Sequence, residues 1–203
     1  MKRIILIFSV LLFVQCNYST QDGDLSEREK RYYREIITLY PKSLVSHLPD
    51  NIDNRKDGAP DLRFPRGRYM NFIHLGLSCD KAEMERLKTE VASKAVGVYH
   101  FGDSCLTIPY NYETFEIIKS DSIRNLPYVN MLPLPNFKAW YGGFSEEICK
   151  EAVIYLLDAE KGRFLPDDCL SKSGVGLPEE WLHGYTKGLI LYRNFVVYWL
   201  EAW

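Results

Sequence analysis

The residues best suited to chemistry form a short repeat. Residues 74–79 read His-Leu-Gly-Leu-Ser-Cys, and residues 100–105 read His-Phe-Gly-Asp-Ser-Cys, so four of six positions agree. Imidazole and thiolate groups are the usual ligands of Zn²⁺, and two cysteines close together can instead form a disulfide. A serine activated by a histidine is a nucleophile. The repeat therefore allows metal binding, a disulfide or nucleophilic catalysis.

The spacing inside each copy favours a disulfide over a metal. If the two copies end neighbouring parallel strands, His74 lies beside His100 and Cys79 beside Cys105, at the edge where α/β sheets place ligands. Each cysteine follows its histidine by five positions, about 16 Å along an extended strand. One metal ion can reach all four side chains only if the chain turns sharply at the glycine of each copy. A disulfide between Cys79 and Cys105 needs no such turn.

The first fifteen residues have the pattern of a secretory signal peptide. Lys2 and Arg3 give a short basic start, and residues 4–14 are apolar except for Ser9. A segment of this kind exports a chain and is then removed. These eleven residues are too few to cross a bilayer, which takes about 20 in a helix. The segment therefore predicts export and does not by itself predict a membrane span.

Residues 13–16, Phe-Val-Gln-Cys, resemble the lipobox of bacterial envelope lipoproteins, in which apolar and small residues precede the cysteine that is acylated. Phe13 stands where Leu is usual, and Gln15 is larger than the usual small residue. The resemblance implies cleavage before Cys16, a lipid on that cysteine and a tether over residues 16–23. Two or more acyl chains, at about 0.8 kcal/mol per buried methylene, anchor a protein stably. Asn17, in place of the Asp common in inner-membrane retention, implies the outer membrane, on its periplasmic or surface side.

The 188 residues that follow the signal segment have a negative net charge and a high content of aromatic residues. Lys2 and Arg3 leave with the signal, so 23 basic residues face 27 acidic ones and the net charge is −4. This charge argues against nucleic acid or an anionic membrane surface as a partner. Aromatic residues make up 14% of the chain, more than a disordered segment would carry. We expect one globular domain over residues 24–203, whose partner is an envelope protein or glycan.

Four cysteines follow Cys16, namely Cys79, Cys105, Cys149 and Cys169. An even number of cysteines in an exported chain favours disulfides. Three pairings are possible, and the order along the chain suggests Cys79 with Cys105 and Cys149 with Cys169. Unpaired thiols and a metal site stay open as alternatives.

The second copy of the repeat also resembles the nucleophile block of the SGNH hydrolases, because Gly102, Asp103 and Ser104 follow an expected strand. The resemblance implies that Ser104 is a nucleophile activated by a histidine, with backbone N–H groups stabilising the oxyanion. The Gly-x-Asn-Asp element of that family is missing. Its late Asp-x-x-His is replaced by Glu-x-x-His, which ends at His183. Ser104 and His183 are therefore the catalytic alternative.

Apolar spacing predicts two long helices and several strands. Helical spacing runs over 25–40, and a second helix begins at Asp80, with four charged residues facing water: Glu83, Arg86, Lys88 and Glu90. Residues 69–77 and 96–101 favour strands on either side of it. Strand, helix and strand form a βαβ unit, so we expect parallel neighbours joined by a right-handed crossover. Residues 50–68 are polar and are expected to be a loop.

The end of the chain predicts a β-hairpin. Residues 184–192 and 195–203 are rich in residues that favour strands, and they flank Arg193-Asn194. Asn194 tolerates the positive φ of a tight turn. A helix is the alternative, since the apolar residues also fit helical spacing, but Gly188 and the β-branched residues favour the hairpin.

These patterns predict an α+β fold, with a mixed sheet that includes the βαβ strands and the C-terminal hairpin and two or three helices packed on it. The expected function is that of an envelope lipoprotein without a cofactor, acting as a non-catalytic binding or structural component. One alternative is an exported serine hydrolase using Ser104 and His183. The other is a metal-binding lipoprotein, with His74, His100, Cys79 and Cys105 as ligands.

Overall fold

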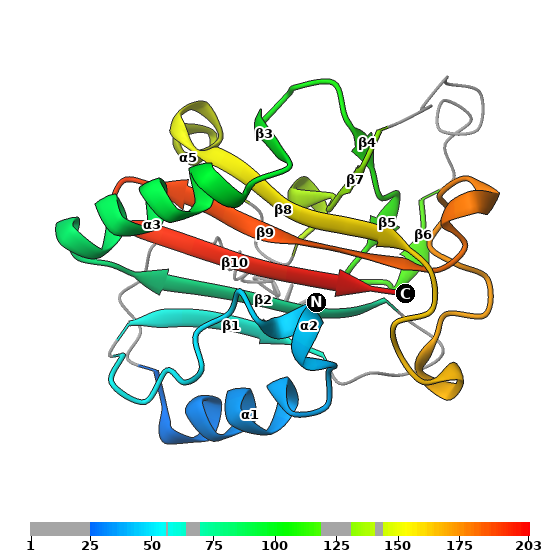
Figure 1. Cartoon of the computed structure of the whole chain (residues 1–203), viewed down its shortest axis with the longest axis horizontal. Helices are drawn as coiled ribbons and strands as arrows, with labels where there is room; N and C mark the ends of the chain where they lie inside the picture. The colour runs from blue at the N-terminus through cyan, green and yellow to red at the C-terminus, as the bar shows by residue number, and fades with distance from the viewer. Residues whose placement is uncertain (1–24, 56, 64–69, 119–130, 141–143) are drawn as a thin grey trace, which may run out of the picture.

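A six-stranded antiparallel sheet forms the centre of the computed structural model (Figure 1), which describes residues 25–55, 57–63, 70–118, 131–140 and 144–203. The strand order is β1–β2–β10–β9–β8–β3, and every neighbouring pair is antiparallel. The strands are β1 Gly58–Leu62, β2 Asn71–Ser78, β3 Gly97–His100, β8 Val153–Lys161, β9 Gly184–Tyr192 and β10 Phe195–Ala202.

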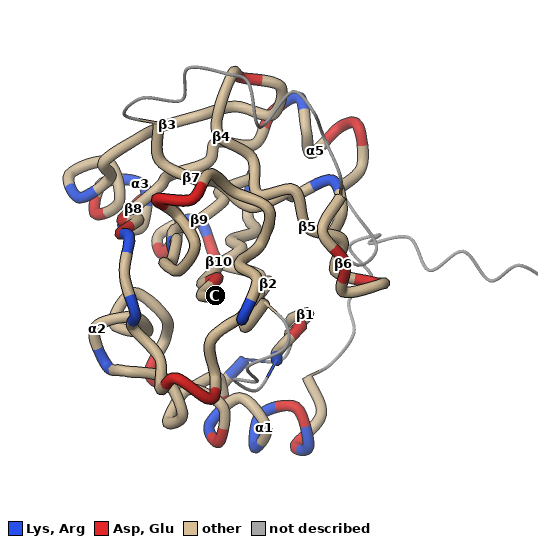
Figure 2. The backbone as a smooth tube through the Cα atoms, turned by 90° about the vertical axis from the view of Figure 1, so that its right-hand side faces the viewer, with Lys and Arg blue, Asp and Glu red and all other residues tan. Residues whose placement is uncertain are grey.

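Helices and short strands cover the two faces of this sheet. The helices are α1 Glu27–Ile37, α2 Lys42–Val45, α3 Lys81–Lys94 and α5 Glu146–Glu151, with 3₁₀ turns η1 Phe137–Ala139, η2 Asp167–Cys169 and η3 Glu179–Trp181. Two small sheets pair β4 Leu106–Thr107 with β7 Pro133–Leu134 and β5 Tyr110–Asn111 with β6 Glu116–Ile117. Figure 2 shows the main sheet between α2 and α3 on one side and β5 and β6 on the other.

The two long helices begin at side-chain caps. Ser26 accepts a hydrogen bond from the backbone N–H of Glu29, whose carboxylate accepts one from the backbone N–H of Ser26 at 2.8 Å, which is a capping box. Asp80 caps α3 by accepting from the backbone N–H of Glu83 at 2.8 Å. Both helices predicted from the sequence are confirmed.

Successive side chains along each strand point to opposite faces of the sheet, so the core has two parts. We call the side covered by α1, α2 and α3 the helical face, and the opposite side the aromatic face. On β2, Leu75 and Leu77 point to the helical face, whereas Phe72 and His74 point to the aromatic face. All four tryptophans of the chain belong to the aromatic face: Trp140, Trp181, Trp199 and Trp203. Each fully buried aliphatic side chain stabilises the fold by about 1.5–3 kcal/mol.

The prediction that β2 and β3 are neighbouring strands is wrong. The two strands point in the same direction, but β10, β9 and β8 lie between them. Four strand spacings of about 4.8 Å separate them by roughly 19 Å. The cause is the C-terminal hairpin, because β10 pairs with β2 from Asn71 to Ser78. The main sheet is consequently antiparallel, while the α+β class is confirmed.

The C-terminal hairpin is confirmed. β9 and β10 pair from Tyr192 and Phe195 onward, so Arg193 and Asn194 form the two-residue turn. The positive φ of 49° falls on Arg193, not on Asn194 as expected. The Arg193 guanidinium donates to Glu147 at 2.7 Å and to Glu151 at 2.9 Å, which ties the turn to α5.

Gly188 makes room for a tryptophan in the middle of the sheet. It lies opposite Trp199 in the pairing of β9 with β10. A Cβ at position 188 would overlap the Trp199 indole and the backbone oxygen of Tyr155. The glycine that the sequence places inside a strand is therefore required by the packing of the aromatic face.

The expectation of a loop over residues 50–68 is wrong for part of that segment. Gly58–Leu62 form β1, the edge strand beside β2. These residues carry little strand propensity, and Pro60 cannot donate to a ladder. A proline is tolerated on an edge strand because its missing N–H can face away from the sheet. Backbone pairing with β2 therefore decides the structure here.

Candidate functional site

The histidines of the repeat lie far apart. His74 pairs with Trp199 and Asp61 in the sheet, whereas His100 pairs with Val153 at the other edge. The strand spacing places the two copies roughly 19 Å apart, too far for one metal ion. Within the described ranges, no group of three or more His, Cys, Asp or Glu side chains is placed to hold a metal.

The cysteines do not form the expected pairs. Cys79, Cys105 and Cys149 are free thiols, so neither Cys79–Cys105 nor Cys149–Cys169 is a disulfide in the structure. Cys79 and Cys105 follow strands roughly 19 Å apart, and a disulfide needs Cα atoms within about 7 Å. Cys149 precedes β8 and Cys169 follows its far end. Burial, with the nearby Glu83 charge second, raises the pKa of the Cys79 thiol to about 12.

Ser104 and His183, the residues of the catalytic alternative, also lie far apart. Ser104 is exposed and follows β3, whose last residue pairs with Val153 at the start of β8. That start lies beside Leu191, near the end of β9, while His183 precedes the beginning of β9. The length of β9, roughly 26 Å, therefore lies between the two side chains. A nucleophile and its base must be within about 3 Å, so the structure does not bring these residues together.

Cys16, the expected lipidation site, lies outside the described residues. Leu25, the first of them, is buried in the core of the helical face. None of the helices in the described part of the chain combines the length and the apolar character needed to span a bilayer.

A polar cleft of about 540 Å³ opens on the helical face, between α3 and the segment after α2. Its floor is formed by the sheet, through Leu157, Asp158, Lys187, Leu189 and Tyr198. One wall comes from residues 46–49 and Arg55, and the other from α3. Four segments that are distant in the sequence thus meet in one cavity, and we call it the helical-face cleft.

A β-bulge brings a carboxylate into this cleft. Leu156 pairs with Gly188 and Asp158 with Lys187, so Leu157 is an extra residue in β8. A bulge re-aims the side chains that follow it, and here both Leu157 and Asp158 line the helical-face cleft. The Asp158 carboxylate accepts a hydrogen bond from the Tyr185 hydroxyl and lies 3.6 Å from the Lys187 ammonium.

Lys187 is a nearly buried cation at the cleft floor. Its side chain is only 11% exposed, and its Nζ donates to the backbone oxygen of Ser43 at 2.8 Å. A buried ammonium needs a counter-charge and hydrogen-bond acceptors. Asp158 and Ser43 supply them, so the charge is compensated without any ligand.

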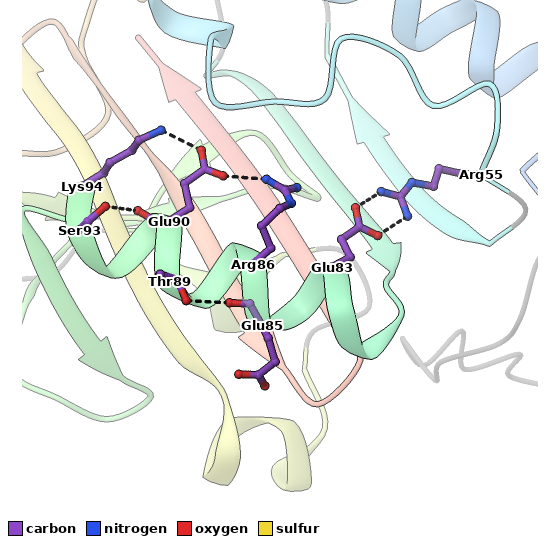
Figure 3. Close-up of polar contacts among 8 residues, drawn as sticks. All are labelled: Arg55, Glu83, Glu85, Arg86, Thr89, Glu90, Ser93 and Lys94. Carbon is purple, nitrogen blue, oxygen red and sulfur yellow. Dashed lines mark hydrogen bonds and ion pairs between the residues drawn. The ribbon is translucent and has the colours of Figure 1, made fainter.

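The wall on α3 is a row of alternating charges. Met84, Leu87 and Val91 are buried on the side of α3 that packs on the sheet, and the charged residues Glu83, Arg86, Glu90 and Lys94 line the cleft (Figure 3). Glu90 accepts from Arg86 at 2.8 Å and from Lys94 at 2.7 Å. These contacts, that of Lys94 first, hold the pKa of the Glu90 carboxyl below its usual range.

Arg55 joins this wall to the other side of the cleft. Its guanidinium makes a two-pronged ion pair with Glu83, with one contact of 2.8 Å, and it also donates to the backbone oxygen of Ser78 at 3.3 Å. The hydrogen bond from Arg55 is the main reason that the pKa of Glu83 is lowered. Two-pronged guanidinium–carboxylate contacts fix geometry as well as charge. The pair therefore holds α3 to the loop that carries Arg55.

His47 belongs to the wall opposite α3. Its Nε2 lies 2.8 Å from the backbone oxygen of Trp199. Burial lowers the pKa of His47 to about 4, so the ring is neutral at pH 7 and Nε2–H is the donor. Its Nδ1 is buried and has no hydrogen-bond partner among the described residues.

The aromatic face holds a second polar cluster, centred on Glu201. Its Oε1 accepts from His74 Nε2 at 2.9 Å, from the Tyr112 hydroxyl at 2.7 Å and from Trp140 Nε1 at 3.2 Å. The His74 ring stacks between Trp140 and Phe72, with centroid distances of 3.7 and 4.4 Å. Burial, and then the Glu201 charge, raises the pKa of Tyr112 well above its usual value.

This Glu201 cluster is enclosed. Glu201 is fully buried, and His74, Tyr112 and Trp140 are 2, 3 and 7% exposed. The cluster joins β2 and β10 to the segments that cover the aromatic face, so it fixes those segments in place. We assign it a structural role, whereas the helical-face cleft is open to a ligand.

The sequence indicates only part of this cleft. The water-facing side of α3 was predicted, and three of its residues, Glu83, Arg86 and Glu90, line the cleft. Asp158 and Lys187 carry no local signal, because the bulge and the pairing of β8 with β9 bring them there. Searches against protein-family models, curated proteins and solved structures found no match to this chain.

Proposed function

We propose that this protein is a lipid-anchored component of a bacterial cell envelope that binds a ligand in the helical-face cleft. One observation carries the anchoring: a basic start and eleven mostly apolar residues are followed closely by Cys16. Leu25, nine positions later, is already part of the core. Nine residues reach at most about 30 Å, so a lipid on Cys16 keeps the domain near the membrane.

The lipid is the main source of membrane attachment in this proposal. The chain after residue 15 has a net charge of −4 and gains nothing from an anionic lipid surface. Two or more acyl chains on Cys16 are sufficient for stable anchoring. Asn17 after the cysteine supports placement at the outer membrane.

The binding role rests on the helical-face cleft. Its charged side chains come from separate segments and already contact one another, so the cleft is ordered before a ligand arrives. A serine hydrolase is not proposed, because Ser104 and His183 lie at opposite ends of β9. A non-catalytic binding component is the function that this geometry supports best.

The anchoring is tested by acyl labelling of the full-length protein in cells of a bacterial host. Wild type, Cys16→Ala and the matched control Cys149→Ala are grown with a radioactive fatty acid and immunoprecipitated. We expect label on wild type and Cys149→Ala and none on Cys16→Ala. The label decides the outcome, because an uncleaved segment 1–15 could keep the variant in the membrane fraction. Equal labelling of all three proteins, or none on wild type, contradicts the proposal.

A further inference from the structure

We infer that the helical-face cleft binds a hydroxyl-rich ligand, an oligosaccharide of the cell envelope. The inference rests on the proposed function for the origin of the glycan, whereas the recognition chemistry follows from the cleft. Its volume of about 540 Å³ lies within the range of about 300–1,000 Å³ that is typical of ligand sites. The α3 wall from Glu83 to Lys94 extends over about 16 Å, so the site is elongated.

The charges that line the cleft are already paired. Four cations, Arg55, Arg86, Lys94 and Lys187, contact three carboxylates, Glu83, Glu90 and Asp158. Phosphate and other polyanions are bound where several cations lack a carboxylate partner. The cleft has a surplus of a single positive charge, so a nucleotide or a phosphorylated ligand is a poor fit.

Paired charges suit hydroxyl groups. A hydroxyl donates one hydrogen bond and accepts others, so it can donate to a carboxylate while it accepts from the neighbouring cation. One hydroxyl can bridge Arg86 and Glu90 in this way, and another can bridge Lys187 and Asp158. Neither ion pair has to break, and no buried charge loses its partner. A ligand with several hydroxyls along one edge can therefore use the whole row.

The apolar part of the floor complements the other side of such a ligand. Leu157, Leu189 and Tyr198 lie between the charged walls. A sugar ring has hydroxyls around its rim and C–H groups on its faces. The rim can meet the ion pairs while a face covers the exposed part of Leu157, since Leu189 and Tyr198 are already buried, and this removes apolar surface from water.

An extended peptide fits this cleft less well. Peptides bind by extending a sheet edge, by placing a helix in an apolar groove, or by docking proline-rich segments on aromatic side chains. The edges of the main sheet are β1 and β3, whereas the cleft floor comes from β8, β9 and β10. Seven charged side chains lie among the apolar ones of its lining, with Tyr198 and His47 as its aromatic rings. A peptide would therefore find neither a backbone ladder nor an apolar groove.

The test measures binding by the full-length protein in detergent. Wild type is applied to an array of bacterial envelope oligosaccharides, from dephosphorylated lipopolysaccharide cores and peptidoglycan glycan strands, together with peptides of similar size, phosphorylated and not. Dissociation constants are then measured by calorimetry for the array members that are retained. The acyl label plays no part in this assay, so a failure of anchoring and a failure of glycan binding are distinguishable.

Two double variants on α3 provide the matched comparison. Arg86→Ala/Lys94→Ala removes two cations from the cleft, and Lys81→Ala/Lys88→Ala removes two that do not line it. Glu85, the ion-pair partner of Lys88 at 3.0 Å, points away from the cleft row in Figure 3. Glu90→Gln is the conservative third variant, because it keeps the side-chain shape if a double variant fails to fold.

We expect wild type to retain at least one oligosaccharide. Arg86→Ala/Lys94→Ala should weaken its affinity tenfold or more, Glu90→Gln should weaken it several-fold, and Lys81→Ala/Lys88→Ala should change it less than twofold. The inference is overturned if no oligosaccharide binds, if only peptides bind, or if the two double variants weaken binding equally.

Discussion

The two faces of the main sheet differ in how far their polar groups are exposed to solvent. On the helical face, Lys187 and Asp158 lie in an open cleft, where the Asp158 side chain is 42% exposed. On the aromatic face, Glu201 is fully buried beneath Tyr112 and Trp140. The same sheet thus carries two polar groups that a ligand can reach, on β8 and β9, and one that it cannot reach, on β10.

This difference in exposure changes how much each polar group contributes to the stability of the fold. An exposed ion pair stabilises a fold by about 0–1 kcal/mol, because water already solvates both charges. A buried carboxylate depends entirely on its protein donors, and losing them leaves a charge or donors without partners. Substitutions of the exposed charges in the helical-face cleft, Arg86, Glu90 and Lys94, should therefore affect binding, while those in the Glu201 cluster should affect folding.

The largest effect is expected from Glu201→Ala. The substitution leaves three buried donors, on His74, Tyr112 and Trp140, without their shared acceptor. We expect the free energy of unfolding to fall by about 3–5 kcal/mol. Urea denaturation measures it, with Glu90→Ala in the cleft as the matched control that should cost less than about 1 kcal/mol. An equal loss of unfolding free energy in the two variants would contradict the proposed difference between the two faces.

The next effect is a pH dependence that arises on the helical face. The pKa of His47 is about 4 in the folded protein and about 6.5 when unfolded, so the unfolded chain binds more protons between these values. Stability is therefore greatest above pH 6.5 and is lost as the pH falls toward 4. The shift corresponds to about 3 kcal/mol at about 1.4 kcal/mol per pKa unit.

His47→Gln isolates this contribution, since glutamine cannot titrate and its amide can still donate to the Trp199 oxygen. Urea midpoints measured between pH 7.5 and 4 should fall more steeply for wild type than for the variant. Glu83, whose pKa is also lowered, adds a loss at more acidic pH in both proteins. Parallel curves for the two proteins would show that His47 is not held neutral.

A smaller effect is expected from Gly188→Ala, which tests the packing of the aromatic face. The added methyl group overlaps the Trp199 indole and the Tyr155 backbone. Overpacking of this kind destabilises by about 1–3 kcal/mol. Gly102→Ala is the control, since φ is 97° there but no atom lies within 4 Å of the added group. Thermal denaturation should rank Gly188→Ala as the more destabilising, and the reverse order would contradict the packing described for Trp199.

Local patterns predicted the elements of this fold better than their arrangement. α1, α3 and the C-terminal hairpin follow from capping residues, helical spacing and a two-residue turn, all of which act within about fifteen residues. The sheet order does not, because it depends on β10 pairing with β2 across more than 100 residues. β1 was missed because its residues have weak strand propensity, and its pairing with β2 is a contact that no local pattern indicates.

The predicted grouping of the repeat residues is wrong for the same reason. His74, His100, Cys79 and Cys105 were grouped on the assumption that β2 and β3 are neighbours, and the inserted strands separate them. The cleft depends on a bulge at Leu157 that no local pattern indicates. Within the repeat, the side-chain partner of His74 is Glu201, which is 127 positions away. The prediction of lipidation at Cys16 stays a prediction.

The last effect concerns thiol reactivity and should leave stability unchanged. Cys79 is buried in the core of the helical face with its pKa raised to about 12, whereas Cys149 is only half-buried. The thiolate is the reactive form of cysteine. Iodoacetamide should therefore alkylate Cys79 at a rate that is about one tenth of the rate at Cys149, or lower. Timed quenching and peptide mass spectrometry give both rates. Equal rates, or a disulfide at either residue, would contradict the structure.

The intact mass of the full-length protein, extracted from bacterial membranes with detergent, tests the proposed function most directly. It reports the first residue of the processed chain and any lipid that the chain carries. We predict a chain that begins at Cys16 and is heavier than its polypeptide by two or more acyl groups. A chain that begins at another residue, or that begins at Cys16 without a lipid, would contradict the proposal that this domain is anchored in the cell envelope.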